Sequence, residues 1–307
     1  MTSLDPDRNK PEVQVTFYSI LKKTVILLCL IAFCCGVGKL LYLERKGFTI
    51  RRIAAPVQTS LHIWDSSADS IIEQPFYYLG RGRQCFAFSS LDGKYVLKLP
   101  RTDIYQNPFW MRALPLSQTL KENSQSMRTS RQKFVLNSMK IAYEELQTDT
   151  GVLAIHFGET KDQGKKLQIV DAVGYSYQLP AHKTSFVLQT KHPILMRTFL
   201  DAIQAGNVEK GKQILDALIT VVVERGKKGI WNKDASFLRN YGFDGEKGYQ
   251  IDIGSFYHRP NGDASIRDTM HHVRTWLETA IDPALLAYFD QMLEEKLSEA
   301  WPHNTCE

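Results

Sequence analysis

The sequence predicts an α+β fold with two lobes, preceded by one membrane-spanning helix. Three observations support this prediction. An uncharged apolar run lies near the start, short strand patterns dominate the first part of the remaining chain, and amphipathic helix patterns dominate the second. The 307 residues are enough for one large domain or two lobes. We divide the chain into a polar tail (1–23), an anchor (24–43), a juxtamembrane segment (44–75) and a globular domain (76–307).

The charge and the cysteines exclude several classes of protein. The formal net charge is only +5, and the basic residues are spread along the whole chain. We therefore expect no nucleic acid partner, because nucleic-acid-binding domains gather their basic residues on one surface. The five cysteines show neither a CxxC pair nor the His/Cys spacing of a zinc site. No disulfide framework is expected.

The apolar run at residues 24–37 contains no charged residue. A helix that crosses a bilayer needs roughly 20 residues. The stretch 24–43 reaches that length if Lys39 extends its ammonium group to the membrane surface. We therefore predict that residues 24–43 anchor the chain in a lipid bilayer. A cleaved signal peptide and a soluble core helix are the alternatives, although the residues near Cys34 make a poor cleavage site.

The basic residues that flank the anchor predict its orientation. The C-terminal flank carries slightly more of them than the N-terminal flank, namely Lys39, Arg45, Lys46, Arg51 and Arg52 against Arg8, Lys10, Lys22 and Lys23. Cytoplasmic flanks carry the excess of Lys and Arg. We therefore expect a single-pass membrane protein with a cytoplasmic globular domain.

Strand patterns begin at residue 76. Residues 76–99 read as consecutive antiparallel strands, with Gly80 and Gly82 at the first turn and an Asp-Gly turn at 92–93. Further strands are expected at 152–157, 167–173 and 185–188. Residues 60–64 could form a short strand or a helical turn.

Helix patterns dominate the rest of the chain. Residues 100–130 are polar and irregular, and a helix capped by Thr129 or Ser130 is expected over 131–147. More helices are predicted at 195–205, 210–225 and, as a pair broken near Asp282, 273–297. Strands thus precede helices in the sequence, which indicates α+β rather than α/β organisation.

Two features of the strand-rich part can bind anions. Gly80 and Gly82 would let backbone amides approach a phosphate closely, although any tight hairpin uses glycine in this way. Lys98 lies inside the apolar strand 96–99. Its side chain is either solvated or directed into a cleft, where it would bind anionic oxygens.

Two features of the helix-rich part can bind a hydroxyl group or a cation. The segment 229–240 offers Asp234, which could orient a hydroxyl, and Asn240, which could bind a metal. Asp252 ends a predicted strand shortly before Gly254. A carboxylate in that position suits a hard cation such as magnesium.

In this order, the four features resemble those of the protein-kinase family over about residues 76–256. The pair Gly80 and Gly82 resembles the glycine-rich loop, and Lys98 resembles the lysine of the third strand. The triplet 232–234 (Asn-Lys-Asp) resembles HRD, and the triplet 252–254 (Asp-Ile-Gly) resembles DFG.

The resemblance implies phosphoryl transfer from ATP with magnesium as the metal. Gly80, Gly82 and Lys98 would bind the nucleotide, and Lys98 and Asp234 would be the catalytic residues. Asn240 and Asp252 would hold the magnesium ion, while Asp234 would orient an acceptor hydroxyl of unknown identity.

The sequence also departs from the family pattern. Asn240 comes one residue late, Cys85 replaces the third glycine, and the acidic partner of Lys98 is ambiguous between Glu144 and Glu145. The short ending is more similar to bacterial small-molecule or lipopolysaccharide-core kinases, or to a pseudokinase. The alternatives are therefore a membrane-tethered pseudokinase or scaffold without catalysis, and an unrelated α+β domain.

Overall fold

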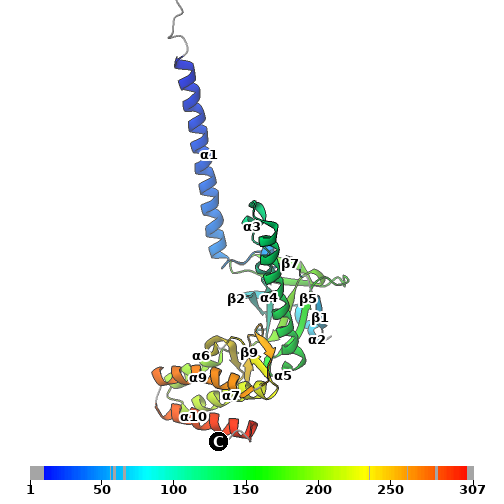
Figure 1. Cartoon of the computed structure of the whole chain (residues 1–307), viewed down its shortest axis with the longest axis vertical. Coiled ribbons are helices and arrows are strands. Elements are labelled where there is room, and N and C mark those ends of the chain that lie inside the picture. The colour runs from blue at the N-terminus through cyan, green and yellow to red at the C-terminus, as the bar shows by residue number, and fades with distance from the viewer. Residues whose placement is uncertain are drawn as a thin grey trace, which may run out of the picture. The chain divides into compact units, whose positions relative to one another are not determined.

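The computed structural model describes residues 10–55, 57, 60–64, 67–234, 236–260, 262–280 and 283–302. The chain divides into two compact units, Met1–Thr49 and Ile50–Glu307. In the first unit, helix α1 (Lys10–Glu44) contains a stretch, Ser19–Glu44, that is long and apolar enough to cross a membrane (Figure 1). Among the described residues it is the one helix with this length and composition. The predicted anchor, 24–43, lies within it.

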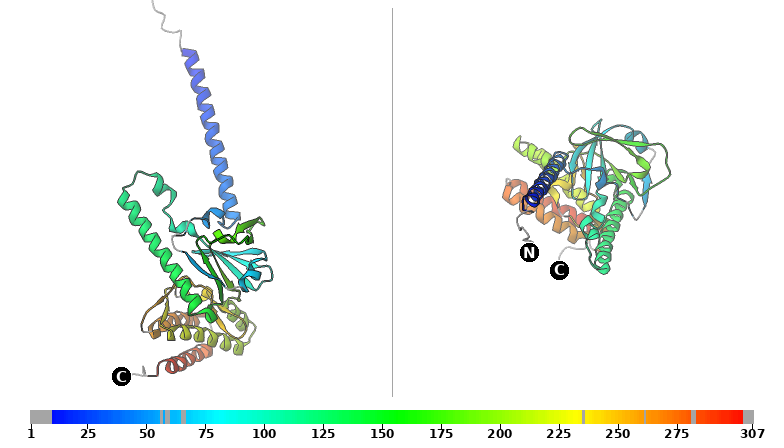
Figure 2. Two further views of the ribbon diagram at one scale, coloured as in Figure 1. Left: turned by 90° about the vertical axis from the view of Figure 1, so that its right-hand side faces the viewer. Right: turned by 90° about the horizontal axis from the view of Figure 1, so that it is seen from above.

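The second unit contains an eight-stranded, curled sheet (Figure 2). Its spatial order is β1-β5-β8-β4-β3-β2-β6-β7, with antiparallel pairs throughout except between β2 and β6. The strands are β1 (Leu61–Trp64), β2 (Phe76–Arg81), β3 (Cys85–Ser90), β4 (Tyr95–Pro100), β5 (Val152–Phe157), β6 (Lys166–Val170), β7 (Ser176–Pro180) and β8 (Phe186–Thr190).

Most of these strands agree with the sequence prediction. Residues 76–99 form β2, β3 and β4, and the glycine-rich turn joins the first two. Two strands differ from the sequence prediction. β7 was not predicted, although its side chains alternate in polarity, and β1 lies within the segment assigned to the juxtamembrane region. β1 pairs with β5, so the compact unit begins at Ile50 and extends beyond the predicted boundary at residue 76.

The prediction for residues 100–130 was wrong. This stretch contains the 3-10 turn η2 (Thr102–Tyr105), helix α3 (Phe109–Ala113) and the first half of helix α4 (Gln118–Glu144). The N-cap of α4 is Ser117, whose hydroxyl accepts a hydrogen bond from the Leu120 amide at 3.3 Å. The first turns of α4 project beyond the sheet (Figure 2) and bury little, so no apolar periodicity marks them in the sequence.

The second half of α4 covers one face of the sheet. Its buried side chains pack against β5, β8 and the segment near Phe256, and they include Val135, Leu136, Met139, Ile141 and Ala142. Helix α5 (Gln147–Thr150) then turns the chain into β5 through Gly151, whose φ of 66° favours glycine.

The helical part surrounds α7 (Val208–Lys227), which buries Ile214, Leu218 and Val222 completely. Around it lie α6 (Leu195–Gln204), α9 (Gly262–Ala280) and α10 (Pro283–Ala300). The predicted helices are confirmed, although α9 begins earlier than expected. Two short ribbons complete this part. They pair β9 (Ile230–Asn232) with β12 (Phe256–His258), and β10 (Tyr241–Phe243) with β11 (Gly248–Gln250).

Candidate functional site

The loop that contains Asp234 runs beside the segment that follows Asp252. Strands β9 and β12 pair antiparallel, with Asn232 opposite Phe256. The Lys233 amide extends this pairing, since it donates to the Ser255 carbonyl at 2.9 Å. Two stretches that are distant in the sequence are therefore adjacent in the structure.

Asn240 lies directly against the same segment. This residue ends the short helix α8 (Phe237–Asn240), and its backbone carbonyl accepts hydrogen bonds from the amides of Ile251 at 2.8 Å and Asp252 at 3.4 Å. The Asn240 side chain is buried, and its Nδ2 atom has no hydrogen-bond partner among the described residues.

Lys98 reaches this segment from the sheet. It lies on β4 opposite Val187 of β8, so its side chain is on the face that α4 covers. Its Nζ atom donates a short hydrogen bond to the carbonyl of Ile251. The backbone at 251–252 therefore connects Lys98 and Asn240 to Asp252, although 153 residues separate Lys98 from Ile251.

The carboxylates of Asp252 and Asp234 are half-buried, and each accepts only one hydrogen bond from the described residues. Asp252 accepts a hydrogen bond from the Gly254 amide at 3.2 Å, and Asp234 accepts one from the Ser236 amide at 3.0 Å. Each bond goes to Oδ1. Among the described residues, no hydrogen bond reaches the Oδ2 atom of either side chain, so each carboxylate keeps an oxygen for a ligand.

The glycine-rich hairpin leaves open space where the sequence predicts phosphate binding. A Cβ atom at Gly80 would meet nothing within 4 Å, and one at Gly82 would come no closer than 3.6 Å to the Cys85 carbonyl oxygen. Packing therefore does not require either glycine. The tip of the hairpin contacts the 252–254 triplet, because the Gln84 side-chain oxygen occupies the space that a Cβ at Gly254 would need. No motif in the sequence marks Gln84.

Cys85, at the position of the missing third glycine, lies near the same charges. Burial raises the pKa of its thiol, and Asp252 raises it further, while Lys98 and Arg101 lower it. The thiol is therefore protonated at neutral pH. These opposing effects place Cys85 within electrostatic range of both Lys98 and Asp252.

Ser138 of α4 holds the 252–254 triplet from the other side. Its hydroxyl donates to the Ile253 carbonyl at 2.6 Å and accepts from the Phe256 amide at 2.6 Å. The side chain is fully buried. A serine within a polar helix gives no local signal of this role, so the sequence alone could not have indicated it.

Neither candidate acidic partner pairs with Lys98. Glu144 lies 3.7 Å from Lys140 on its own helix, and Glu145 lies 3.0 Å from His258. The Lys98 ammonium instead donates a hydrogen bond to the backbone carbonyl of Ile251. Neither Glu144 nor Glu145 is therefore the acidic partner of Lys98.

The donor set suits magnesium better than a transition metal. The described residues contain no group of three His, Cys, Asp or Glu side chains that could hold a metal ion. Magnesium usually binds to one or two carboxylates together with phosphate oxygens and waters. Asp252 keeps one carboxylate oxygen free of hydrogen bonds among the described residues, and its backbone amide donates to the Asn240 carbonyl at 3.4 Å, so these two neighbouring residues could contribute to such a site.

Comparison with known proteins gives only distant likenesses. No protein-family model matches the chain, and no curated protein matches it. Among solved structures, WbdD is similar with a TM-score of 0.34 and 18% identity, over 73% of this chain and 46% of that one. A complex of WbdD with a kinase inhibitor gives 0.37 and 18%, over 71% and 44%.

A further structure, of the bifunctional kinase-methyltransferase WbdD, gives a TM-score of 0.34 and 16% identity over 82% of this chain and 49% of that one. The chain thus spans about half the length of the solved structures that it matches. These TM-scores are too low to equate two folds. The function of this chain is therefore argued from contacts within the chain itself.

Proposed function

We propose that this protein is a membrane-anchored, kinase-like phosphotransferase that uses ATP and magnesium to phosphorylate a hydroxyl group. One observation supports this function best. The Lys98 ammonium and the Asn240 backbone both bind the short segment at 251–252, which carries Asp252. The Lys98 ammonium thus contacts the segment that carries the Asp252 carboxylate, and Gln84 of the glycine hairpin contacts the same segment at Gly254. A cation, a carboxylate and open backbone amides on neighbouring segments suit a polyphosphate.

Each residue has a distinct role in this proposal. Lys98 would bind the α- and β-phosphate oxygens in place of the Ile251 carbonyl, and the backbone amides near Gly80 and Gly82 would bind the phosphates. Asp252 and Asn240 would hold magnesium, and the ion would supply charge neutralisation at the phosphates. Asp234 orients the acceptor hydroxyl and accepts its proton. Catalysis would depend mainly on positioning and charge stabilisation.

A nucleotide-binding protein without catalysis is the second candidate. Two observations favour it. The Asn240 side chain is buried rather than directed to solvent, and Lys98 lacks an acidic partner among the described residues. A protein of this kind would bind ATP and transfer no phosphate.

Thermal unfolding of the full chain in lipid nanodiscs, with and without Mg-ATP, tests nucleotide binding. We expect Mg-ATP to raise the melting temperature of the wild type, and to do so far less for Lys98→Ala and Asp252→Ala. Lys94→Ala is the matched control, because Lys94 is exposed on the turn before β4. No shift in the wild type, or an equal loss in the control, would contradict the proposal.

Formation of ADP together with a phosphorylated acceptor separates the two candidates. An active enzyme turns over ATP with a candidate acceptor, and Asp234→Asn abolishes this turnover while leaving the Mg-ATP thermal shift intact. A thermal shift without any turnover indicates the non-catalytic protein.

The proposed location has its own test. The segment 24–43 should keep the chain in the membrane pellet after alkaline carbonate extraction. Added protease should digest the unit Ile50–Glu307 in inverted vesicles of a bacterial expression host and spare it in intact spheroplasts. The opposite pattern would place that unit outside the cytoplasm and remove access to ATP.

A further inference from the structure

A hollow lies on the face of the sheet opposite to Lys98. His156 of β5 pairs with His62 of β1 and with Phe186 of β8, whereas Lys98 pairs with the next residue of β8, Val187. Paired residues share a face of the sheet, and successive residues alternate between faces. The hollow and the candidate nucleotide site therefore use different sides of the sheet and share no residue.

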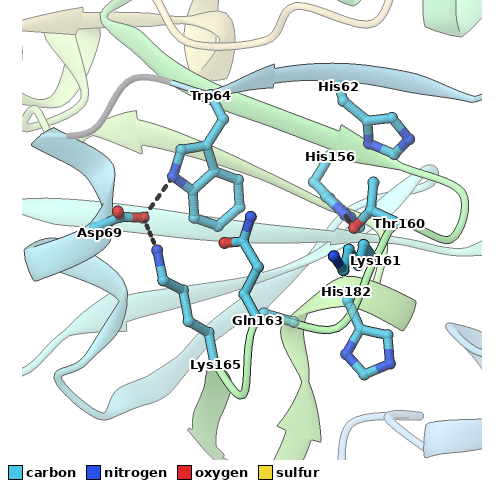
Figure 3. A pocket seen from close by; sticks show the side chains of 10 residues that line it. His62, Trp64, Asp69, His156, Thr160, Lys161, Gln163, Lys165 and His182 are labelled. Carbon is cyan, nitrogen blue, oxygen red and sulfur yellow. Dashed lines mark hydrogen bonds and ion pairs between the residues drawn. The ribbon is translucent and has the colours of Figure 1, made fainter.

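The hollow is a cavity of about 410 Å³ between β1, β5 and the loop that leads into β6 (Figure 3). This volume is within the range of about 300–1,000 Å³ that is typical of small-molecule sites. Its lining combines aromatic and polar side chains: His62, Trp64, Asp69, His156, Thr160, Lys161, Gln163, Lys165, Ala181 and His182.

One wall is a fixed aromatic surface. The Trp64 indole Nε1 donates to Asp69 Oδ1 at 2.7 Å, and Lys165 Nζ lies 2.5 Å from the same oxygen (Figure 3). Asp69 belongs to helix α2 (Ser67–Ile72). The hydrogen bond from Lys165 is the main reason that the pKa of Asp69 is lowered, so the carboxylate is charged and paired. Its Oδ2 atom has no hydrogen bond among the described residues.

The opposite wall contains a neutral histidine. His156 is buried, and burial lowers its pKa. Its Nδ1 atom donates to the Thr184 carbonyl at 2.9 Å, because a carbonyl can only accept, and its Nε2 atom therefore accepts from the Thr160 hydroxyl at 3.1 Å. The Thr160 hydroxyl thus donates its proton to His156, and its oxygen can still accept a hydrogen bond from a ligand.

Four more polar side chains line the cavity without a hydrogen bond to any described residue. Three of them are the imidazole of His62, the ammonium of Lys161 and the amide of Gln163, and the fourth is the imidazole of His182, whose Nδ1 atom lies 3.0 Å from Asp162 Oδ1. Burial lowers the pKa of His62, so its ring offers one donor and one acceptor. The Lys161 ammonium adds hydrogen-bond donors, and the Gln163 amide adds both a donor group and an acceptor oxygen.

The chemistry of these walls selects a class of ligand. A simple anion would face the Asp69 carboxylate and the acceptor oxygen of Thr160. A hydrocarbon would leave Lys161 and Gln163 without hydrogen-bond partners, and the desolvation of these polar groups would cost free energy. A ring that carries several hydroxyl groups can donate to the acceptors and accept from the donors. Its C–H face can also pack against the indole of Trp64.

We propose that this cavity binds a saccharide of one or two pyranose rings. The proposal does not depend on phosphoryl transfer, because no lining residue belongs to the candidate nucleotide site. Trp64 supplies the apolar contact, and Gln163 and Lys161 bind hydroxyl groups.

Saturation-transfer NMR on the full chain in nanodiscs tests this inference. The probes are methyl β-glucopyranoside, methyl α-mannopyranoside and methyl β-galactopyranoside, with sorbitol and inorganic phosphate as comparison compounds. We expect transfer to the ring protons of at least one glycoside and none to sorbitol. Gln163→Ala should weaken binding about fivefold, the effect of losing one hydrogen bond.

Two variants complete the design. Gln178→Ala is the matched control, because Gln178 is exposed on β7 and does not line the cavity, so it should bind like the wild type. Trp64→Ala should abolish binding, and Gln163→Ala remains informative if Trp64→Ala fails to fold. Transfer to none of the glycosides, displacement of a bound glycoside by phosphate, or equal affinity in Gln163→Ala and the control would overturn the inference.

Discussion

Replacing Ser138 with alanine tests how the structure holds the segment around Asp252. The hydroxyl is fully buried and makes two hydrogen bonds of 2.6 Å, one to the Ile253 carbonyl and one from the Phe256 amide. In Ser138→Ala both backbone groups lose their partner in a site that is closed to water. An unsatisfied buried polar group costs about 1–3 kcal/mol.

The expected loss of unfolding free energy is therefore about 2–4 kcal/mol, after some relaxation of the two groups. Alanine is the better helix former, which offsets a small part of this loss. Ser130→Ala is the matched control, because Ser130 is exposed on the same helix and gains the same helix propensity. The difference between the two variants isolates the buried hydrogen bonds.

Urea unfolding followed by tryptophan fluorescence measures this difference. The five tryptophans all lie outside α1, so the signal reports on the unit Ile50–Glu307; they are Trp64, Trp110, Trp231, Trp276 and Trp301. For a unit of this size, the expected loss lowers the urea midpoint by about 1 M. Equal midpoints for Ser138→Ala and Ser130→Ala would refute the reasoning that α4 anchors this segment through its hydroxyl.

Three further predictions concern packing, pH and the hairpin. Gly248→Ala should destabilise the protein by about 1–3 kcal/mol in the same urea assay, because the new Cβ would lie 2.5 Å from the Ala217 carbonyl oxygen of α7. Gly80→Ala should leave the urea midpoint unchanged, since its Cβ meets open space, and should weaken the Mg-ATP thermal shift. Stability should fall as pH decreases from 7 to 5: burial lowers the pKa of His156 below its ordinary 6.5, so the unfolded chain binds a proton that the folded state excludes. His156→Gln should reduce this pH dependence, and an unchanged dependence would contradict the assignment.

Local patterns in the sequence determined several parts of this protein. The apolar stretch at 24–43, with Lys39 as its one charged residue, indicates a helix of membrane-spanning length, because composition and length alone define such a segment. Alternation predicts β2, β3 and β4, and the apolar stripe of α7 predicts that helix. The candidate residues Lys98, Asp234, Asn240 and Asp252 also stood out, because each has a distinctive neighbourhood in the sequence. Their roles in nucleotide and magnesium binding stay predictions.

Tertiary structure decided how those parts meet. The bond from Lys98 to Ile251, the two bonds of Ser138 and the contact of Gln84 with Gly254 all join residues that are distant in the chain. Such contacts depend on how elements pack and leave no periodic signal in the sequence. The first turns of α4 were missed for a related reason, since a projecting helix buries little and therefore needs no apolar stripe. The cavity beside Trp64 is a product of strand register, because only the pairing of β1 with β5 brings His62 and His156 onto one face.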